Sequence, residues 1–499
     1  NNLLNLAKSL LNIHFPEDLD AQKAAYNRLS FEEFFLFQLP LVLRKLKKKD
    51  KAGIRHRVDG KLVSDFISGL PFELTDAQKK VLAEIKMDMS LPRPMQRLLQ
   101  GDVGSGKTVV ATAACLMAAQ GGYQAAFMAP TEILARQHFE KIRSQEKQIA
   151  AALLTGSAGK KEKDAIYQEI SAGKIDLVIG THALLEEGVQ FKNLGLVVID
   201  EQHKFGVGQR CLLPAKGPNP DILIMTATPI PRTLAITLYG DLDVSVINEL
   251  PPGRLPVKTF LFEQARREEA YQLAKQELRK GRQVYIIYPV IEDSYAMDIS
   301  GAKKMYAELR SGEFRDFKLG LIHGRLKQEE QDKIMAGFKA GKIAMLISTT
   351  VLEVGIDVAN ASCMIIEHAE RFGLSQLHQL RGRVGRGRDA SICALVSDAG
   401  TDEARARLEA MVKYCDGFRI AEEDLRIRGP GEFFGRAQHG LSELKIAKPL
   451  AQMQLLKRAR EEAIKLLAAD PRMESRQNSL LKEKLLRRFP GYERFMAAG

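Results

Sequence analysis

Residues 101–108 read Gly-Asp-Val-Gly-Ser-Gly-Lys-Thr and constrain the fold more than any other stretch of the chain. They match a P-loop, in which glycines let backbone N–H groups close around phosphate oxygens and a following helix adds its N-terminal dipole. The apolar run 109–120 supplies that helix. The motif therefore predicts a nucleotide-binding α/β domain. Its expected ligands are Gly104, Gly106 and Lys107 for the phosphates, and Thr108 for Mg²⁺.

A second motif is the apolar segment 197–199, which ends in the acidic pair Asp200-Glu201. Two carboxylates at the end of a buried strand are costly unless they meet a cation. Asp200 is suited to hold Mg²⁺ through water, and Glu201 to orient and deprotonate an attacking water. An exposed acidic turn is the alternative interpretation.

A third motif, residues 381–388, alternates arginine with glycine and valine. Planar guanidinium groups pair well with phosphate oxygens, and glycine allows close approach. Together with a P-loop elsewhere in the chain, this pattern favours arginine fingers over an RNA-binding basic loop. Before the P-loop, Gln78 is either the third residue of a capping box that starts at Thr75, or a reader of the adenine edge; spacing alone does not decide between them.

Short apolar runs that alternate with helical segments predict two tandem α/β lobes with parallel sheets. The predicted strands are Gln124–Pro130, Leu177–Gly180, Leu196–Asp200, Ile222–Thr226, Gln283–Pro289, Leu319–His323, Ala344–Ser348, Cys363–Glu367 and Ile392–Val396. The Pro- and Gly-rich stretch 251–256 marks a boundary. The expected division is a helical segment over 1–71, a first lobe over 72–250, a second lobe over 251–400 and a helical tail over 401–499.

The N-terminal segment contains a candidate capping box, Ser30 to Glu33, before a phenylalanine-rich apolar run. This pattern predicts a helix that starts there and runs into the basic stretch 44–49. The basic stretch is either a solvated helix end, favoured by the helix dipole, or a DNA contact.

Composition excludes several classes of protein. The hydrophobic fraction of 45% is globular, and the formal net charge of +12 suits a polyanionic partner. Five scattered cysteines without a C-x-x-C pair indicate neither a disulfide framework nor a zinc site, which favours a reducing cytoplasm. The longest apolar run, 109–119, is too short to cross a membrane. Because the chain starts with Asn1, we interpret it as a fragment or a processed product.

The motifs and their order resemble those of superfamily 2 helicases. The match runs from about residue 72 to 400, through Ala-Pro-Thr-Glu at 129–132, Gly-Thr-His at 180–182, Asp-Glu-Gln-His at 200–203, Thr-Ala-Thr-Pro at 226–229, 348–357 and 379–386. Asp-Glu-Gln-His followed by Phe-Gly-Val resembles the bacterial RecG and Mfd families. The tail segment 416–438 is similar to the translocation motif that both share, while residues 1–70 are similar to the RecG segment that follows its wedge domain.

The resemblance implies that the two lobes are RecA-like. It also implies an ATP- and Mg²⁺-dependent motor on double-stranded and branched DNA. Forks would be regressed and Holliday junctions migrated, in DNA repair and recombination. A monomer, a bacterial cytoplasmic location and single-strand DNA-binding protein as a partner are further expectations. The alternatives are an Mfd-like transcription-repair translocase, an RNA helicase and a non-enzymatic DNA-binding scaffold.

The resemblance also assigns roles residue by residue. Gln78 becomes the adenine reader, and Lys107, Asp200, Glu201, Arg383 and Arg386 the catalytic set. The remaining assignments are Gly355 and Asp357 for the nucleotide, Thr131, Arg136, Thr181 and Thr349 for the DNA backbone, and Arg428 and Gln438 for translocation.

Overall fold

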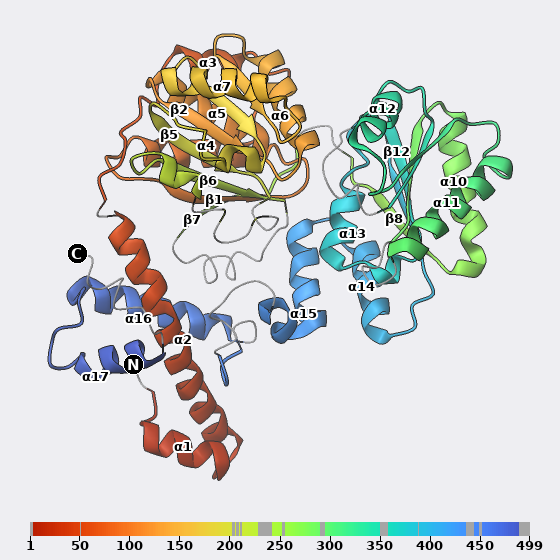
Figure 1. Cartoon of the computed structure of the whole chain (residues 1–499). Coiled ribbons are helices and arrows are strands. Elements are labelled where there is room, and N and C mark those ends of the chain that lie inside the picture. The colour runs from red at the N-terminus through yellow and green to blue at the C-terminus, as the bar shows by residue number, and fades with distance from the viewer. Residues whose placement is uncertain are drawn as a thin grey trace.

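The computed structural model contains two α/β lobes and a helical base (Figure 1). It describes residues 3–49, 51–201, 205, 209, 212–227, 242–251, 255–289, 295–349, 358–387, 389–435, 444–448 and 452–488.

The first lobe is built on a seven-stranded sheet in which every pair of neighbours is parallel. In spatial order its strands are β3 (Ala151–Leu154), β4 (Leu177–Gly180), β2 (Gln124–Met128), β5 (Leu194–Ile199), β6 (Asp221–Thr226), β1 (Gln96–Gly101) and β7 (Asp243–Ile247). Its helices are α3 (Lys61–Ser68), α4 (Asp76–Met89), α5 (Lys107–Gln120), α6 (Glu132–Gln145) and α7 (Lys160–Ala172).

The second lobe has a six-stranded parallel sheet. Its order is β10 (Leu319–Ile322), β11 (Met345–Ser348), β9 (Gln283–Ile287), β12 (Ala361–Ile366), β13 (Ile392–Val396) and β8 (Lys258–Phe262). The helices are α10 (Arg267–Arg279), α11 (Tyr295–Ser311), α12 (Gln328–Lys339) and α13 (Leu374–Arg381), and the short 3₁₀ turns of both lobes lie at His182–Leu185, Pro214–Lys216, Gln264–Arg266 and Ala369–Arg371. The expected two tandem RecA-like lobes are confirmed.

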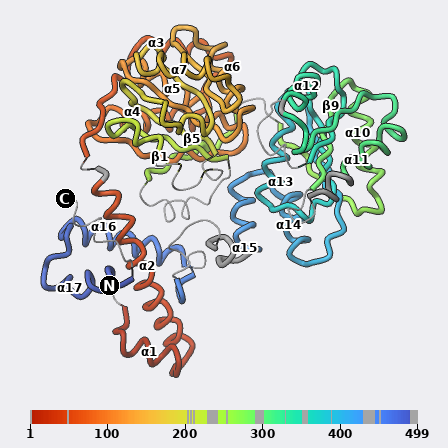
Figure 2. The backbone as a smooth tube through the Cα atoms, viewed as in Figure 1, coloured from red at the N-terminus to blue at the C-terminus, as the bar shows by residue number. Residues whose placement is uncertain are grey.

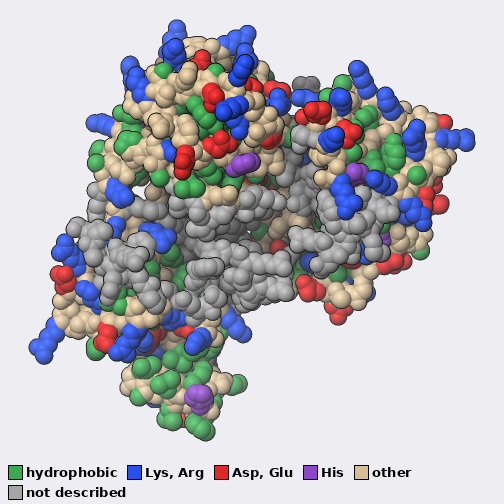
Figure 3. All heavy atoms as spheres, viewed as in Figure 1, with side chains coloured by type: hydrophobic (Ala, Val, Ile, Leu, Met, Phe, Trp, Pro, Cys, Tyr) green, Lys and Arg blue, Asp and Glu red, His purple; other side chains and the backbone are tan. Residues whose placement is uncertain are grey.

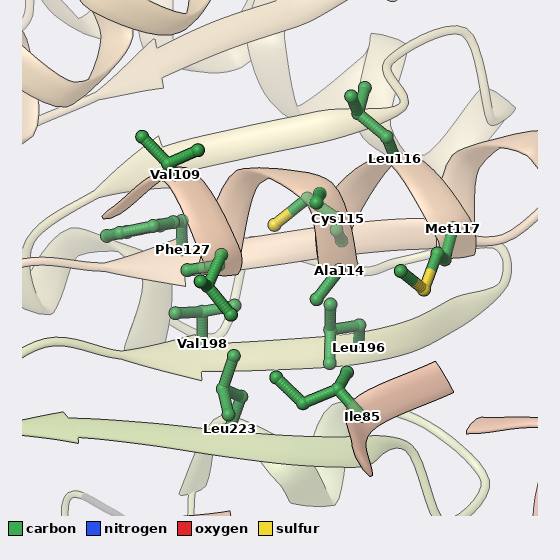
Figure 4. Packing of buried hydrophobic residues seen from close by; sticks show 14 of the residues in the cluster. Ile85, Val109, Ala114, Cys115, Leu116, Met117, Phe127, Leu196, Val198 and Leu223 are labelled. Carbon is green, nitrogen blue, oxygen red and sulfur yellow. The ribbon is translucent and has the colours of Figure 1, made fainter. Parts of the chain in front are cut away.

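Helix α5, which follows the P-loop, forms the centre of the first lobe. It is apolar on all sides and packs on the sheet beside α4 (Figure 4). Ala114 and Leu116 on this helix, and Phe127 and Val198 on strands β2 and β5, are fully buried. A helix held on every side fixes the position of the loop at its N-terminus.

All nine predicted strands are present, with ends that differ by at most two residues. The strands not predicted are β1, β3, β7 and β8. Of these, β3, β7 and β8 lie at sheet edges, where one side of the strand meets solvent and the apolar run is broken. Strand β1 is central but carries Arg97 and Gln100, which interrupt its apolar pattern.

The helical base joins the two ends of the chain. The long helix α2 (Leu19–Lys49) packs beside α16 (Met453–Ala469) and α1 (Leu6–His14), and α17 (Ser479–Arg488) completes the base (Figures 1 and 2). Helices α14 (Asp402–Lys413) and α15 (Gly417–Gly435) lead from the second lobe towards it.

The predicted helix start at Ser30 is wrong. Helix α2 begins at Leu19 behind Asp18, whose carboxylate accepts the N–H of Ala21 at 2.6 Å, and it continues through Ser30. Instead of capping its own helix, the Glu33 carboxylate accepts N–H groups of residues 445–447 in the tail. In the basic stretch, Lys45 forms an ion pair of 2.6 Å with Asp243 of the first lobe.

The N-terminal helices carry an exposed apolar surface. Large apolar side chains are exposed on α1 and the start of α2, where they cover one end of the molecule (Figure 3): Leu6, Leu10, Leu11, Phe15 and Leu19. Among the described residues, no helix is both long and apolar enough to span a membrane.

A candidate nucleotide site where the lobes meet

The P-loop connects β1 to α5 and has the backbone that its glycines allow. Gly104 and Gly106 have φ angles of 76° and 89°, in the left-handed region that side chains disfavour. The Lys107 ammonium donates to the carbonyl oxygens of Gly101 and Asp102, at 2.7 and 2.9 Å. Lys107 therefore lies along its own loop, at the place where a phosphate would offer it oxygens instead.

Gln78 forms the capping box at the start of α4. Its Oε1 accepts the N–H of Thr75 at 2.9 Å, and its own N–H donates to Thr75 Oγ1. The side-chain amide also donates to the Ser105 carbonyl of the P-loop at 2.7 Å. The capping-box interpretation is confirmed. The adenine-reading role stays a prediction, which requires Gln78 to exchange these bonds for a base.

The acidic pair follows β5 directly. The Asp200 carboxylate accepts the N–H of Glu201 at 3.0 Å and lies 3.1 Å from His138 Nε2 on α6. Glu201 has a φ of 47°, a left-handed conformation that is costly for a non-glycine residue, and its carboxylate accepts the N–H of Ala227 at 3.3 Å. The pair is partly or fully buried, not an exposed turn. His138 was not predicted, since nothing in its sequence surroundings marks it.

Electrostatics couple this pair to the P-loop. Burial and the neighbouring Asp200 raise the pKa of Glu201 to about 7, although Lys107 opposes the shift. Burial lowers the pKa of Lys107, and the carboxylates of Glu201, Asp200 and Asp102 oppose that change. A carboxyl with a pKa near neutrality is suited to accept a proton from water.

The residues present fit a magnesium ion. Mg²⁺ usually takes one or two carboxylates, and completes its shell with water and substrate phosphates. The charge of Asp200 acts on the P-loop lysine, and Thr108 is the second residue of α5, which begins at that loop. No group of three or more acidic, histidine or cysteine side chains placed to bind a metal occurs among the described residues.

Two arginines of the second lobe reach this site of the first lobe. The charge of Arg383 acts to lower the pKa of Glu201, and the charge of Arg386 acts to lower that of Lys107. Arg386 also donates from Nε to the Gly382 carbonyl at 3.2 Å, within the same turn. The structure therefore brings Lys107, Asp200, Glu201, Arg383 and Arg386 together.

The lobes meet at the P-loop itself. Asp102 Oδ1 lies 2.6 Å from Nε2 of His378 on α13. A Cβ atom on Gly382 would lie 2.8 Å from the Cβ of Val103, so these two segments are in tight contact. Neither Asp102 nor His378 was predicted, because the two residues of this contact lie 276 positions apart in the chain.

The predicted DNA-binding threonines lie at the carboxyl ends of strands. Thr131 follows β2 and caps α6, Thr181 follows β4, and Thr349 follows β11. Arg136 is exposed on α6. Thr181 and Thr349 are buried, so a contact with DNA would require their side chains to be uncovered.

Four predicted residues are described only in part or not at all. Gly355, Asp357 and Gln438 lie outside the described residues. The backbone of Arg428 belongs to α15.

Three family models match the chain in series. They are the DEAD/DEAH box helicase model over residues 75–236, the helicase conserved C-terminal domain over 267–388, and the C-terminal part of domain 3 of the ATP-dependent DNA helicase RecG over 414–488. A Bacillus subtilis protein described as ATP-dependent DNA helicase RecG is 46% identical over 484 residues. The alignment covers 96% of this chain and 71% of that protein. The chain belongs to the RecG family. The expected choice of RecG over Mfd is thereby confirmed.

Other RecG proteins are similarly identical to this chain, but the alignments cover a smaller share of their length. The Synechocystis RecG helicase is 49% identical over 98% of this chain, which spans 59% of that relative. A solved structure of RecG bound to a three-way DNA junction has a TM-score of 0.74 and 47% identity. The structural alignment covers 92% of this chain and 60% of the RecG chain in that structure. The chain thus spans about three fifths of these relatives.

Proposed function

We propose that this chain is the motor part of an ATP-dependent DNA helicase that translocates on double-stranded DNA and acts on branched DNA. Stalled-fork regression and branch migration of Holliday junctions, in repair and recombination, are the expected outcomes. The observation that carries the proposal is the direct contact between the P-loop and the arginine-bearing segment of the second lobe: Asp102 Oδ1 lies 2.6 Å from His378 Nε2, and Gly382 packs tightly against Val103.

Each residue has a defined task in hydrolysis. Lys107 would leave the carbonyls of its loop for the phosphates of ATP, and Thr108 and Asp200 would hold Mg²⁺, which neutralises phosphate charge when bound. Glu201 would take the proton of the attacking water, and the arginines would stabilise charge on the transferring phosphoryl group. Because the transferring phosphoryl group needs residues from both lobes, hydrolysis is tied to closure of the lobes.

Several features support DNA as the track. The related proteins are described as DNA helicases, and one of the solved structures is bound to a three-way DNA junction. The formal charge of +12 and the lysines and arginines spread over the visible face (Figure 3) suit a phosphate backbone. Thr131, Arg136, Thr181 and Thr349 are proposed contacts to that backbone, which carries no base code.

The proposal extends to the organisation of the protein. Gln78, Gly355 and Asp357 complete the nucleotide site, and Arg428 and Gln438 serve translocation. The division at residues 72, 251 and 401 separates the units, and a monomer in the bacterial cytoplasm, with single-strand DNA-binding protein as a partner, is the working state.

The test is ATPase activity of this chain with forked DNA, with RNA duplex and with neither. We expect forked DNA to stimulate turnover and RNA not to do so, while Lys107→Ala abolishes turnover. Binding to forked DNA should weaken with salt, with a log–log slope of about −0.9 per neutralised phosphate. Stimulation by RNA alone, or turnover in Lys107→Ala within twofold of the unaltered chain, would refute the assignment.

A further inference from the structure

One carboxylate in the P-loop is held by groups from three parts of the chain. Asp102 Oδ1 accepts the N–H of Val103 at 2.6 Å and faces His378 Nε2 at 2.6 Å. Its Oδ2 accepts the N–H of Gly417, the first residue of α15, at 3.2 Å. The first lobe, the second lobe and the tail therefore meet at Asp102.

The hydrogen bonds around His378 define which nitrogen carries its proton. Arg381 Nη2 lies 3.1 Å from His378 Nδ1, and a guanidinium can only donate. Nδ1 is therefore an acceptor, and the proton on Nε2 is donated to Asp102.

Arg381 continues this chain of contacts into the tail. It is buried and donates to the carbonyl oxygens of Met411 and Tyr414, each at 2.8 Å, and of Cys415 at 3.0 Å. These carbonyls end α14 and form the turn into α15. Asp102, His378 and Arg381 form a polar relay, and we use that name for these three residues.

The relay lies in a rigid setting. Gly382 packs against Val103 without room for a methyl group, so the segments that carry His378 and Asp102 cannot slide freely. Burial alone would raise the pKa of Asp102, but the hydrogen bond from His378, the Val103 N–H and the charge of Lys107 lower it overall. Asp102 is thus a charged acceptor, which strengthens its bonds to both partners.

Lys107 connects the relay to the nucleotide. Its ammonium donates to the backbone carbonyl of Asp102, the same residue whose side chain holds His378 and Gly417. When a phosphate takes over the ammonium, that carbonyl loses its donor and the Asp102 backbone can shift. The carboxylate then moves with it.

We propose that His378 is a positioning residue that couples the P-loop to helix α15, so that nucleotide binding moves the base of the tail through the Asp102–His378–Arg381 relay. The inference rests on the proposed function, because it takes ATP as the ligand of the P-loop. It assigns His378 no contact with nucleotide or DNA.

The exposed thiol of Cys415 reports on this movement without requiring catalysis. It lies two residues before α15, in the turn that Arg381 holds. The rate of maleimide labelling at Cys415 would be measured by mass spectrometry of its peptide, with and without Mg²⁺ and a non-hydrolysable ATP analogue. We expect the analogue to change this rate at least twofold in the unaltered chain.

Three variants isolate the relay. His378→Leu should bind the analogue within about twofold of the unaltered chain yet lose the labelling change. His378→Gln, whose amide can both donate to Asp102 and accept from Arg381, should keep at least half of it. Arg419→Ala is the matched control, because Arg419 lies on α15 but pairs only with Glu422 among the contacts described for its side chain, and it should leave the change intact.

A further variant covers the case in which His378→Leu does not fold. Asp102→Asn keeps an acceptor for His378 but turns an N–H group towards Gly417, so it should reduce the labelling change with the lobe contact kept. A full labelling change in His378→Leu, or in Asp102→Asn where the leucine variant is unfolded, would overturn the inference. The inference would also be overturned if analogue binding left the rate of Cys415 labelling in the unaltered chain unchanged. Failure of the unaltered chain to bind the analogue would instead refute the proposed function, and the inference with it.

Discussion

The Glu201 carboxyl is held where burial and Asp200 oppose its ionisation, and pH is therefore a probe of the site. Its pKa is raised from 4.5 to about 7, so the folded protein binds this proton more tightly than the unfolded chain does. The resulting stabilisation is complete below pH 4.5 and is lost as the pH rises through 7.

Glu201→Gln removes that pH-dependent cost. In the absence of nucleotide and at pH 8, we expect the melting temperature of the variant to lie roughly 2 to 4 °C above that of the unaltered chain. At pH 5 the two melting temperatures should be nearly the same. Thermal denaturation at the two pH values measures the difference. A difference that is the same at both would show that Glu201 ionises normally. Hydrolysis should be lost at every pH, because the glutamine cannot accept a proton.

Arg386→Ala tests the reach of the second lobe into the nucleotide site. Arginine fingers act on charge in the transition state, so binding of an ATP analogue should change little while turnover falls by about 10³ to 10⁵. Fluorescence titration and phosphate release measure the two quantities. Weakened binding with normal turnover of bound ATP would contradict the role.

The sequence predicted the residues of this site better than their contacts. The P-loop, the acidic pair and the arginines each have a local pattern that carries the chemistry. His138 beside Asp200, and His378 beside Asp102, have none, since each bond depends on how two distant elements meet. The left-handed backbone of Glu201 is likewise set by the surrounding fold.

At the level of elements, α2 is anchored to the tail through one side chain. Glu33 accepts the N–H groups of Lys445, Ile446 and Ala447 at 3.1, 2.9 and 2.8 Å, and lies 3.5 Å from an Arg488 nitrogen. Tyr26, which also lies on α2, donates its hydroxyl to the Ile446 carbonyl of the tail. Three backbone donors on one buried carboxylate make a strong local attachment.

Glu33→Ala should loosen that attachment. It leaves the three donors without their acceptor, and we expect a loss of about 2 to 4 kcal/mol in the stability of the packing between α2 and the tail. Hydrogen exchange at residues 445–447, with thermal denaturation, measures the effect. Glu32→Ala is the matched control. Its carboxylate is partly exposed and pairs with Arg28 and Lys484, so it should cost less than about 1 kcal/mol. Equal losses in both variants would contradict the role of Glu33.

The sequence predicted elements best where one pattern runs without interruption. Buried central strands such as β4 and β13 were found with both ends correct. The start of α2 was misplaced because Ser30 and Glu33 have capping-box spacing, whereas Glu33 bonds to residues more than 400 positions away. Local spacing cannot reveal such a partner.

At the level of the whole molecule, the proposed function separates ATP hydrolysis from movement of DNA. In the sequence, Arg428 and Gln438 lie beyond the nucleotide motifs, in the segment similar to the translocation motif. If that segment converts lobe closure into a push on duplex DNA, changing either residue to Ala should spare basal and DNA-stimulated ATPase. Unwinding of forks should fall more than tenfold.

ATPase and fork-unwinding assays on the same preparations test this separation, with Lys107→Ala as the variant that loses both. If the two residues only support the local fold of the tail, thermal stability, ATPase and unwinding should fall together. Parallel loss of both activities, or unchanged unwinding, would remove Arg428 and Gln438 from the mechanism.

The pairing of α2 with the tail has a consequence for how the protein is made. A ribosome adds about 5 to 20 residues per second, so roughly 20 to 90 seconds separate the synthesis of α2 from that of α16 and α17. The first lobe can fold meanwhile, because its sheet is complete at β7. Phe34 and Leu39, fully buried in the finished base, must wait uncovered for that whole interval. The apolar face of α2 therefore stays without its tail partners until synthesis is nearly finished.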